Sequence, residues 1–210
     1  MRFLFLAVVL TSLPSGLDAQ LPTDRDPTNP GLKEVLFVGD SVMAGIERSD
    51  QGMKLLSRNF TFAFAAKGCQ RLTLPGCTNS SKKSSFELLK QNNGLITKVV
   101  VVATGYNEFN NSTAFRRDVI RICNEAKRQG IQVLWLTYRE AGNVEKKSRA
   151  FNIVLHEVAI IQGNLEIIDW NLYSKGHSDW FAEDDVHLSG IGPLKMAKMI
   201  AERLATEIHL

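Results

Sequence analysis

The stretch Glu34-Val35-Leu36-Phe37-Val38-Gly39-Asp40-Ser41 runs from an apolar segment into a glycine and two polar residues. Its first five residues are almost wholly apolar, which is typical of a strand buried on both faces of a parallel sheet. The polar residues that follow should then lie at the carboxyl end of that strand. An Asp-Ser pair in this place, taken alone, is most often a helix cap.

Further apolar runs recur along the chain and are separated by segments of helical periodicity. One helix is predicted from Phe115 to Ala126, with Ser112 as its cap and Gly130 at its end. Strands that alternate with helices predict an α/β fold, a three-layer α/β/α sandwich with a central parallel sheet of about five strands. The other predicted strands are Phe60–Ala65, Lys98–Ala103, Ile131–Thr137 and Leu165–Ile168.

Polar residues also follow strands elsewhere in the chain. Asn107 follows the run that ends at Ala103, and the sequence Asp184-Asp185-Val186-His187 comes after the last predicted strand. Parallel sheets bind ligands beyond the carboxyl ends of their strands. We therefore expect Ser41, Asn107 and the Asp184–His187 segment to lie near one another.

Ser41 and His187 are the residue types of a serine hydrolase. A serine nucleophile needs a base to remove its proton and a carboxylate to orient that base. His187 is the candidate base and Asp184 the candidate carboxylate, with Asp185 as the alternative acid. A lone Asp-x-x-His sequence is also common in solvated turns, so this prediction depends on the fold bringing the residues together.

The order of these motifs resembles the GDSL/SGNH hydrolase family. Gly39-Asp40-Ser41 matches its first motif, and Asp184-x-x-His187 matches its last. Gly105-Tyr106-Asn107-Glu108 matches the Gly-x-Asn-Asp motif, with Glu108 in place of the final aspartate. The chain is most similar to small secreted bacterial members, including the SGNH domains attached to membrane O-acyltransferases.

This resemblance implies a flavodoxin-like SGNH hydrolase fold and an ester-cleaving reaction through an acyl-serine intermediate. It also implies that the backbone N–H groups of Ser41 and Gly68 and the side-chain amide of Asn107 stabilise the oxyanion. Two interpretations stay open for Gly68, an oxyanion donor or a turn glycine beside a cysteine. Asn107 has the same alternative as a plain turn residue.

The N-terminus has the features of an export signal. Residues 1–19 combine a positive start, an apolar stretch and a small-residue cleavage region, which predicts a signal peptide. Residues 20–32 contain three prolines and predict an extended leader, so the hydrolase-like domain is predicted over residues 33–210. We expect a secreted or periplasmic protein without a stable membrane span.

The three cysteines fit an oxidising compartment. Cys69 and Cys77 enclose a short loop that contains a Pro-Gly turn, which predicts a disulfide between them. Cys123 falls within a helical pattern and is expected to be a buried free thiol. No cysteine or histidine pair has the spacing of a zinc site, so we expect neither a metal nor a cofactor.

Composition limits the classes of partner. The 210 residues are 44% hydrophobic and 22% charged with a formal net charge of +3, which predicts one globular domain without affinity for nucleic acid. The expected substrate is an ester-bearing small molecule, a lipid or an acylated carbohydrate. Arg71 and Arg139 could face an anionic substrate group or pair with acids, and Trp170, Trp180 and Phe181 could line a pocket or pack in the core.

Two other functions remain open. The same triad could transfer an acyl group to a sugar hydroxyl, since the acyl-serine intermediate is common to both reactions. A non-catalytic secreted module that binds a glycan or a protein is the alternative from another class. The sequence does not indicate an oligomeric state.

Overall fold

The structure is a computed structural model that describes residues 31–208. The predicted signal peptide and most of the predicted leader lie outside the described residues. The division of the chain into these segments stays a prediction. No helix in the described part is long and apolar enough to cross a membrane.

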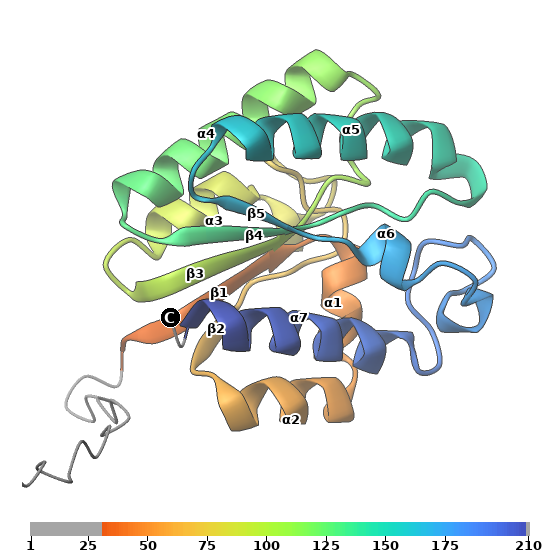
Figure 1. The fold of residues 1–210 in the computed structure, drawn as a ribbon, viewed down its shortest axis with the longest axis horizontal. Helices are drawn as coiled ribbons and strands as arrows, with labels where there is room; N and C mark the ends of the chain where they lie inside the picture. The colour runs from red at the N-terminus through yellow and green to blue at the C-terminus, as the bar shows by residue number, and fades with distance from the viewer. Residues whose placement is uncertain (1–30, 209–210) are drawn as a thin grey trace, which may run out of the picture. The chain divides into compact units, whose positions relative to one another are not determined.

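A five-stranded parallel sheet forms the centre of the domain, in the order β2-β1-β3-β4-β5 (Figure 1). All five strands were predicted, and the predicted sandwich is confirmed. The strands are β1 (Lys33–Gly39), β2 (Phe62–Phe64), β3 (Ile96–Ala103), β4 (Gln132–Leu136) and β5 (Leu165–Ile168).

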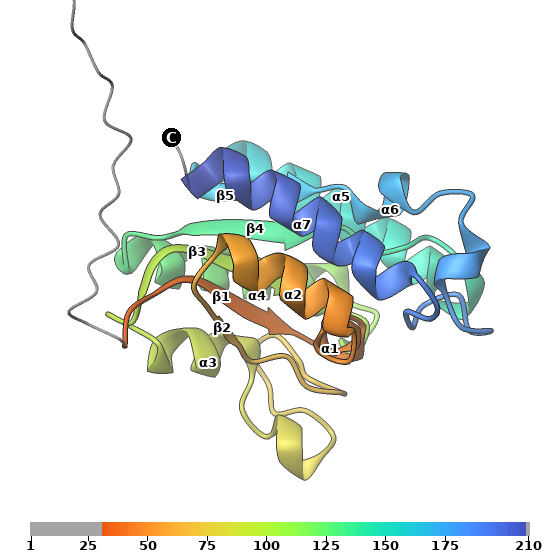
Figure 2. The same ribbon diagram turned by 90° about the horizontal axis from the view of Figure 1, so that it is seen from below.

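Helices cover both faces of the sheet (Figures 1 and 2). One face carries α1 (Ser41–Glu47), α2 (Asp50–Asn59) and α7 (Gly192–Ile208), and the other carries α3 (Ser85–Gln91), α4 (Ser112–Arg128) and α5 (Glu145–Ile161). A short helix, α6 (Trp170–Tyr173), follows β5, and 3-10 turns lie at Asn79–Ser81, Gly142–Val144 and Ser178–Trp180.

Alternation along the strands explains the two layers of core. In β1, Val35 and Phe37 pack on the side of α1, α2 and α7, while Leu36 and Val38 pack on the side of α3, α4 and α5. All four side chains are buried, because a parallel sheet in such a sandwich has no solvated face. Burial of both faces fixes the register, since a shift by one residue would exchange the two sets of side chains.

One predicted helix start was wrong by a residue. Ser112 is the first helical residue of α4, and Asn111 is its N-cap, with the side chain accepting from the N–H of Ala114 at 2.9 Å. Both residue types cap helices well, so the sequence could not choose between neighbours. At the other end Gly130 has a φ of +72°, as expected for the residue that ends this helix.

Candidate active site

Ser41 lies at the turn between β1 and α1. Asp40 is the N-cap of α1, accepting from the N–H of Val42 at 3.0 Å, so the helix-cap interpretation of Asp40 is confirmed. Only glycine fits at position 39, because a Cβ there would lie 2.2 Å from the Cβ of Met43. This close turn places Ser41 at the carboxyl end of a central strand, where its side chain is half-buried.

A chain of hydrogen bonds joins Ser41, His187 and Asp184. Nε2 of His187 lies 2.8 Å from Oγ of Ser41, and Nδ1 of His187 lies 2.5 Å from Oδ2 of Asp184. The other carboxylate oxygen, Oδ1, accepts from the N–H groups of Val186 and His187 at 3.0 and 2.9 Å. The structure thus brings together the three groups that nucleophilic catalysis by serine requires, in the order that it requires them.

The hydrogen bonds of Asp184 favour the ionised form of its carboxylate. The hydrogen bond from the His187 side chain, assisted by the backbone donors, lowers the pKa of Asp184 to about 2. Asp184 therefore stays ionised at neutral pH. An ionised acceptor at Nδ1 favours the tautomer in which Nε2 carries no proton and can accept one from Ser41.

The side chain that hydrogen-bonds to Nδ1 of His187 belongs to Asp184 and not to Asp185. The carboxylate of Asp185 pairs with Arg139 at 3.3 Å, and its φ of +60° turns the chain between Asp184 and His187. Arg139 also donates to the carbonyl of Ser174 at 3.0 Å and lies 3.8 Å from the centre of the Phe181 ring. Arg139 thus pairs with an acid, and it holds the segment that carries Asp184 and His187.

The aromatic residues near this segment are part of the core. Trp170, Trp180 and Phe181 are all nearly fully buried, and the two indole rings stack with their centroids 6.0 Å apart. The backbone of Phe181 pairs with Leu188 in an isolated antiparallel bridge. These contacts fix the base of the loop from Phe181 to Leu188. Of the two interpretations that the sequence left open for the aromatic residues, the structure supports core packing.

The predicted oxyanion donors lie on three different segments. The N–H of Lys67 donates to the carbonyl of Gly39 at 2.9 Å, so Gly68 follows directly beside the turn that carries Ser41. Gly68 is exposed, and a Cβ on it would meet nothing within 4 Å. The side-chain nitrogen of Asn107 donates to the carbonyl of Gln70 at 3.3 Å, which leaves its second N–H available. The structure brings these segments to the same end of the sheet.

Asp40 connects two of these segments, a role that the sequence analysis missed. Its Oδ2 accepts from the N–H groups of Gly105 and Tyr106, both at 3.2 Å, in addition to the cap at Oδ1. Burial raises the pKa of Asp40 to about 6, against the lowering effect of these donors. One buried carboxylate therefore connects the turn that carries Ser41 to the turn that carries Asn107.

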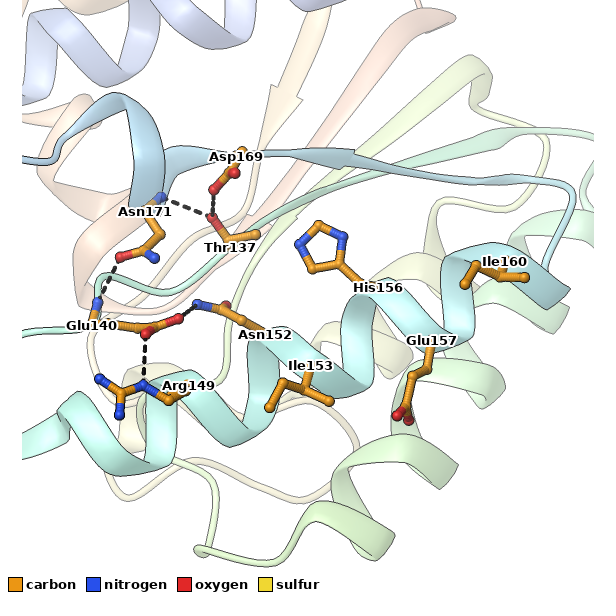
Figure 3. Close-up of a pocket in the computed structure, with 10 residues that line it drawn as sticks. All are labelled: Thr137, Glu140, Arg149, Asn152, Ile153, His156, Glu157, Ile160, Asp169 and Asn171. Carbon is orange, nitrogen blue, oxygen red and sulfur yellow. Dashed lines mark hydrogen bonds and ion pairs between the residues drawn. The ribbon is translucent and has the colours of Figure 1, made fainter.

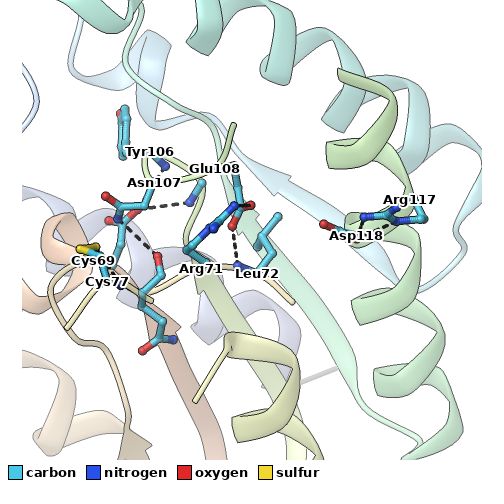
Figure 4. A network of polar contacts seen from close by, with 12 residues as sticks. Cys69, Arg71, Leu72, Cys77, Tyr106, Asn107, Glu108, Arg117 and Asp118 are labelled. Carbon is cyan, nitrogen blue, oxygen red and sulfur yellow. Dashed lines mark hydrogen bonds and ion pairs between the residues drawn. A yellow bond between two sulfur atoms is a disulfide. The ribbon is translucent and has the colours of Figure 1, made fainter. Parts of the chain in front are cut away.

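Glu108, which stands where the family motif has aspartate, contacts the loop after Cys69. Its Oε1 accepts from the N–H of Leu72 at 2.6 Å, and its Oε2 lies 3.4 Å from Arg71 (Figure 4). Arg71 thus pairs with an acid as well, and its guanidinium also lies 4.4 Å from the ring centre of Phe109. The glutamate fixes the loop after Cys69 to the turn of Asn107.

The predicted disulfide is present between Cys69 and Cys77, whose Cα atoms are 5.6 Å apart. Cys123 is free and buried, and burial raises the pKa of its thiol to about 12. The disulfide closes the loop that contains Gln70 and Leu72, which contact Asn107 and Glu108 respectively.

Reduction of this disulfide should impair the ester turnover predicted from the sequence more than global folding, because the closed loop holds groups of the candidate site rather than the central sheet. Turnover and circular dichroism melting should be compared before and after reduction, with a Cys69→Ser/Cys77→Ser variant alongside. Peptide mapping of the oxidised protein should find Cys123 unpaired. Loss of turnover only at temperatures where the reduced protein has unfolded would contradict this expectation.

A cavity of about 350 Å³ lies away from these residues, between α5 and the segments that follow β4 and β5 (Figure 3). Its lining includes His156, Glu140 and Asp169 but none of the residues of the hydrogen-bonded chain. Its polar groups are largely paired with one another, as between Thr137 and Asp169 at 2.9 Å. Within residues 31–208 there is also no cluster of three or more side chains that could hold a metal ion.

Comparisons with known proteins place the fold. The catalytic domain of peptidoglycan O-acetyltransferase A from Streptococcus pneumoniae superposes with a TM-score of 0.60 and 21% identity, over 84% of this chain and 93% of that domain. A "putative SGNH hydrolase" from Slackia heliotrinireducens gives a TM-score of 0.61 and 21% identity, over 82% and 99% of the two chains.

Sequence comparisons give a shorter match. A "putative O-acetyltransferase" of Staphylococcus aureus is 42% identical over 53 residues, which are 25% of this chain and only 9% of that protein. No family model matches the sequence. The structural likeness extends over most of the chain, and the resemblance first drawn from the motifs is confirmed at the level of the fold: this protein has the fold of the SGNH hydrolases.

Proposed function

We propose that this protein is a serine esterase that cleaves an ester through an acyl-serine intermediate. The observation that carries the proposal is the hydrogen-bonded chain from Oγ of Ser41 through His187 to Asp184. A non-catalytic binding module has no requirement for this geometry. The SGNH hydrolase fold supports an enzyme of ester cleavage or acyl transfer.

In the proposed first step, Oγ of Ser41 attacks the ester carbonyl while His187 takes its proton at Nε2. The oxyanion that forms accepts hydrogen bonds from the Ser41 and Gly68 N–H groups and from Asn107. Each such donor contributes about 3 to 4 kcal/mol to the stability of the transition state. The ester C–O bond then breaks, and the imidazolium gives its proton to the departing alcohol.

In the second step, His187 removes a proton from water, and the oxygen of that water attacks the acyl-serine carbonyl. The bond to Oγ breaks, Ser41 recovers its proton from His187, and the carboxylic acid leaves. Asp184, whose pKa the hydrogen bond from His187 lowers to about 2, stabilises the imidazolium in both steps without taking a proton. The side chains of His187 and Asp184 are 48% and 49% exposed, so the reactive centre is open to an ester on a bulky carrier such as an acylated carbohydrate.

Acyl transfer is a second candidate, favoured by the short match to the Staphylococcus aureus protein and by the fold of the pneumococcal acetyltransferase domain. The acyl-serine would then be attacked by a sugar hydroxyl in place of water.

We also propose that the protein acts outside the cytoplasm. The disulfide supports this location, because such bonds persist in oxidising compartments.

Purified protein is expected to turn over short-chain aryl esters and to be labelled by a fluorophosphonate at Ser41. Peptide mass spectrometry locates the label, and product analysis with and without added carbohydrate separates hydrolysis from transfer. Free acid as the main product under both conditions supports the esterase. A protein that is neither labelled nor active on these esters would contradict the esterase proposal and favour the binding module.

A further inference from the structure

Asn107 sits in the middle of a tight turn. The N–H of Glu108 donates to the carbonyl of Gly105 at 3.0 Å, which closes the turn around Tyr106 and Asn107. If Asn107 stabilises the oxyanion, as the proposed function requires, its side chain must be held in place before the substrate arrives. The contacts that hold the backbone of this turn therefore affect how well Asn107 can stabilise the oxyanion.

Lys147 of α5 reaches this turn from the helical layer. Its Nζ donates to the carbonyl oxygen of Tyr106 at 2.7 Å and approaches the carbonyl oxygen of Glu108 at 3.4 Å. These two carbonyls belong to the residues immediately before and after Asn107. A single ammonium group thus holds the backbone on both sides of the candidate oxyanion donor.

Asp40 holds the same turn through its N–H groups. It accepts from Gly105 and Tyr106, so the backbone N–H of Tyr106 is bound by Asp40 and its carbonyl by Lys147. The side chain of Lys147 is half-buried, and desolvation lowers its pKa while the charges of Asp40 and Glu108 raise it. A partly desolvated lysine costs stability unless its contacts compensate, and here the carbonyl oxygens of Tyr106 and Glu108 and the charges of Asp40 and Glu108 do so.

We propose that Lys147 is a positioning residue for ester cleavage, one that fixes Asn107 where the oxyanion forms. This inference rests on the proposed function. It assigns to Lys147 no contact with the substrate. Its effect is expected on turnover rather than on substrate affinity, because a misplaced oxyanion donor weakens transition-state binding selectively.

The test compares Lys147→Met with Lys146→Met, a matched change at the neighbouring exposed lysine of the same helix. Lys147→Met should lower kcat about tenfold with KM within about twofold, as expected for a small displacement of a catalytic group. Lys146→Met should leave both constants unchanged. Lys147→Arg, which keeps the charge and the donors, should recover most of the loss, and circular dichroism should show a folded protein in every case.

A double-mutant cycle with Asn107→Ala identifies the route of the effect. Asn107→Ala should itself lower kcat about a hundred- to a thousand-fold by removing one donor. In that background Lys147→Met should have almost no further effect, because two residues that act through one group are not additive. The same tenfold loss in both backgrounds would show that Lys147 does not act through Asn107, and would overturn the proposal.

A spectroscopic measurement separates this proposal from the proposed function. The side-chain amide signals of Asn107 in a 15N-labelled sample are assigned by their absence from the Asn107→Ala spectrum. They should shift or broaden in Lys147→Met and stay in place in Lys146→Met, whether or not the protein cleaves esters. Unchanged signals in Lys147→Met would overturn the positioning role, whereas the absence of labelling and turnover in the wild type would overturn the proposed function.

Discussion

Replacing Ser41 with alanine is expected to abolish nearly all ester turnover while leaving the fold intact. Ser41 is half-buried at the start of α1, where alanine fits, and the cap of that helix is Asp40 rather than Ser41. His187→Ala should be similarly severe, because it removes the base at 2.8 Å from Oγ. Each loss should reach about 10⁶-fold in kcat, as in serine enzymes whose nucleophile or base is removed.

The double variant Ser41→Ala/His187→Ala should be little worse than either single variant, since the two residues act as one unit. Initial rates on an aryl ester measure this. Ser57→Ala and His156→Ala, which change an exposed serine of α2 and an exposed histidine of α5, are the matched controls and should retain full activity. Substantial turnover by Ser41→Ala would refute the serine-hydrolase proposal as a whole.

Asp184→Asn is expected to lower turnover about 10⁴-fold, whereas Asp185→Asn should cost less than about tenfold. An asparagine at position 184 can still accept from the backbone of Val186 and His187, so the loop should keep its shape. Its amide would donate to Nδ1 of His187 and stabilise the wrong tautomer. Asp185→Asn weakens only the pair with Arg139, which is partly exposed at the aspartate.

Steady-state kinetics of the two asparagine variants, with melting curves for both, make this comparison. The reverse ranking would move the orienting role to Asp185.

The pH dependence of the stability provides a second check on Asp184. The pKa of Asp184 is lowered from 3.8 to about 2, so the stability that its contacts contribute is fully present above pH 3.8 and is lost as the pH falls through about 2. Asp184→Asn should therefore reduce the loss of stability in that acid range.

The layers of the fold could be predicted from the sequence because their signal is local. Apolar runs of four to eight residues indicate buried parallel strands, and the intervening periodicity indicates helices. The strand ends were less certain. Phe60 belongs to the end of α2 rather than to β2, since an apolar residue serves a helix end and a strand start equally well. The predicted N-cap of α4, Ser112, differs by one residue from the observed N-cap, Asn111, because both residue types cap helices.

The sequence by itself determined the order of the strands along the chain, the position of Ser41 after β1, and the spacing that puts Asp184 within reach of His187. It also indicated the pairing of Cys69 with Cys77, because these properties depend on neighbouring residues. Only the tertiary structure decided that His187 meets Ser41 across 146 residues and that its ring pairs with Asp184 instead of Asp185. It alone also revealed the contacts around Asn107, which come from Asp40, Gln70, Glu108 and Lys147. Charged and amide side chains carry no periodic signal, and each can find a partner on any segment that the sheet brings near, so their pairing is settled by packing.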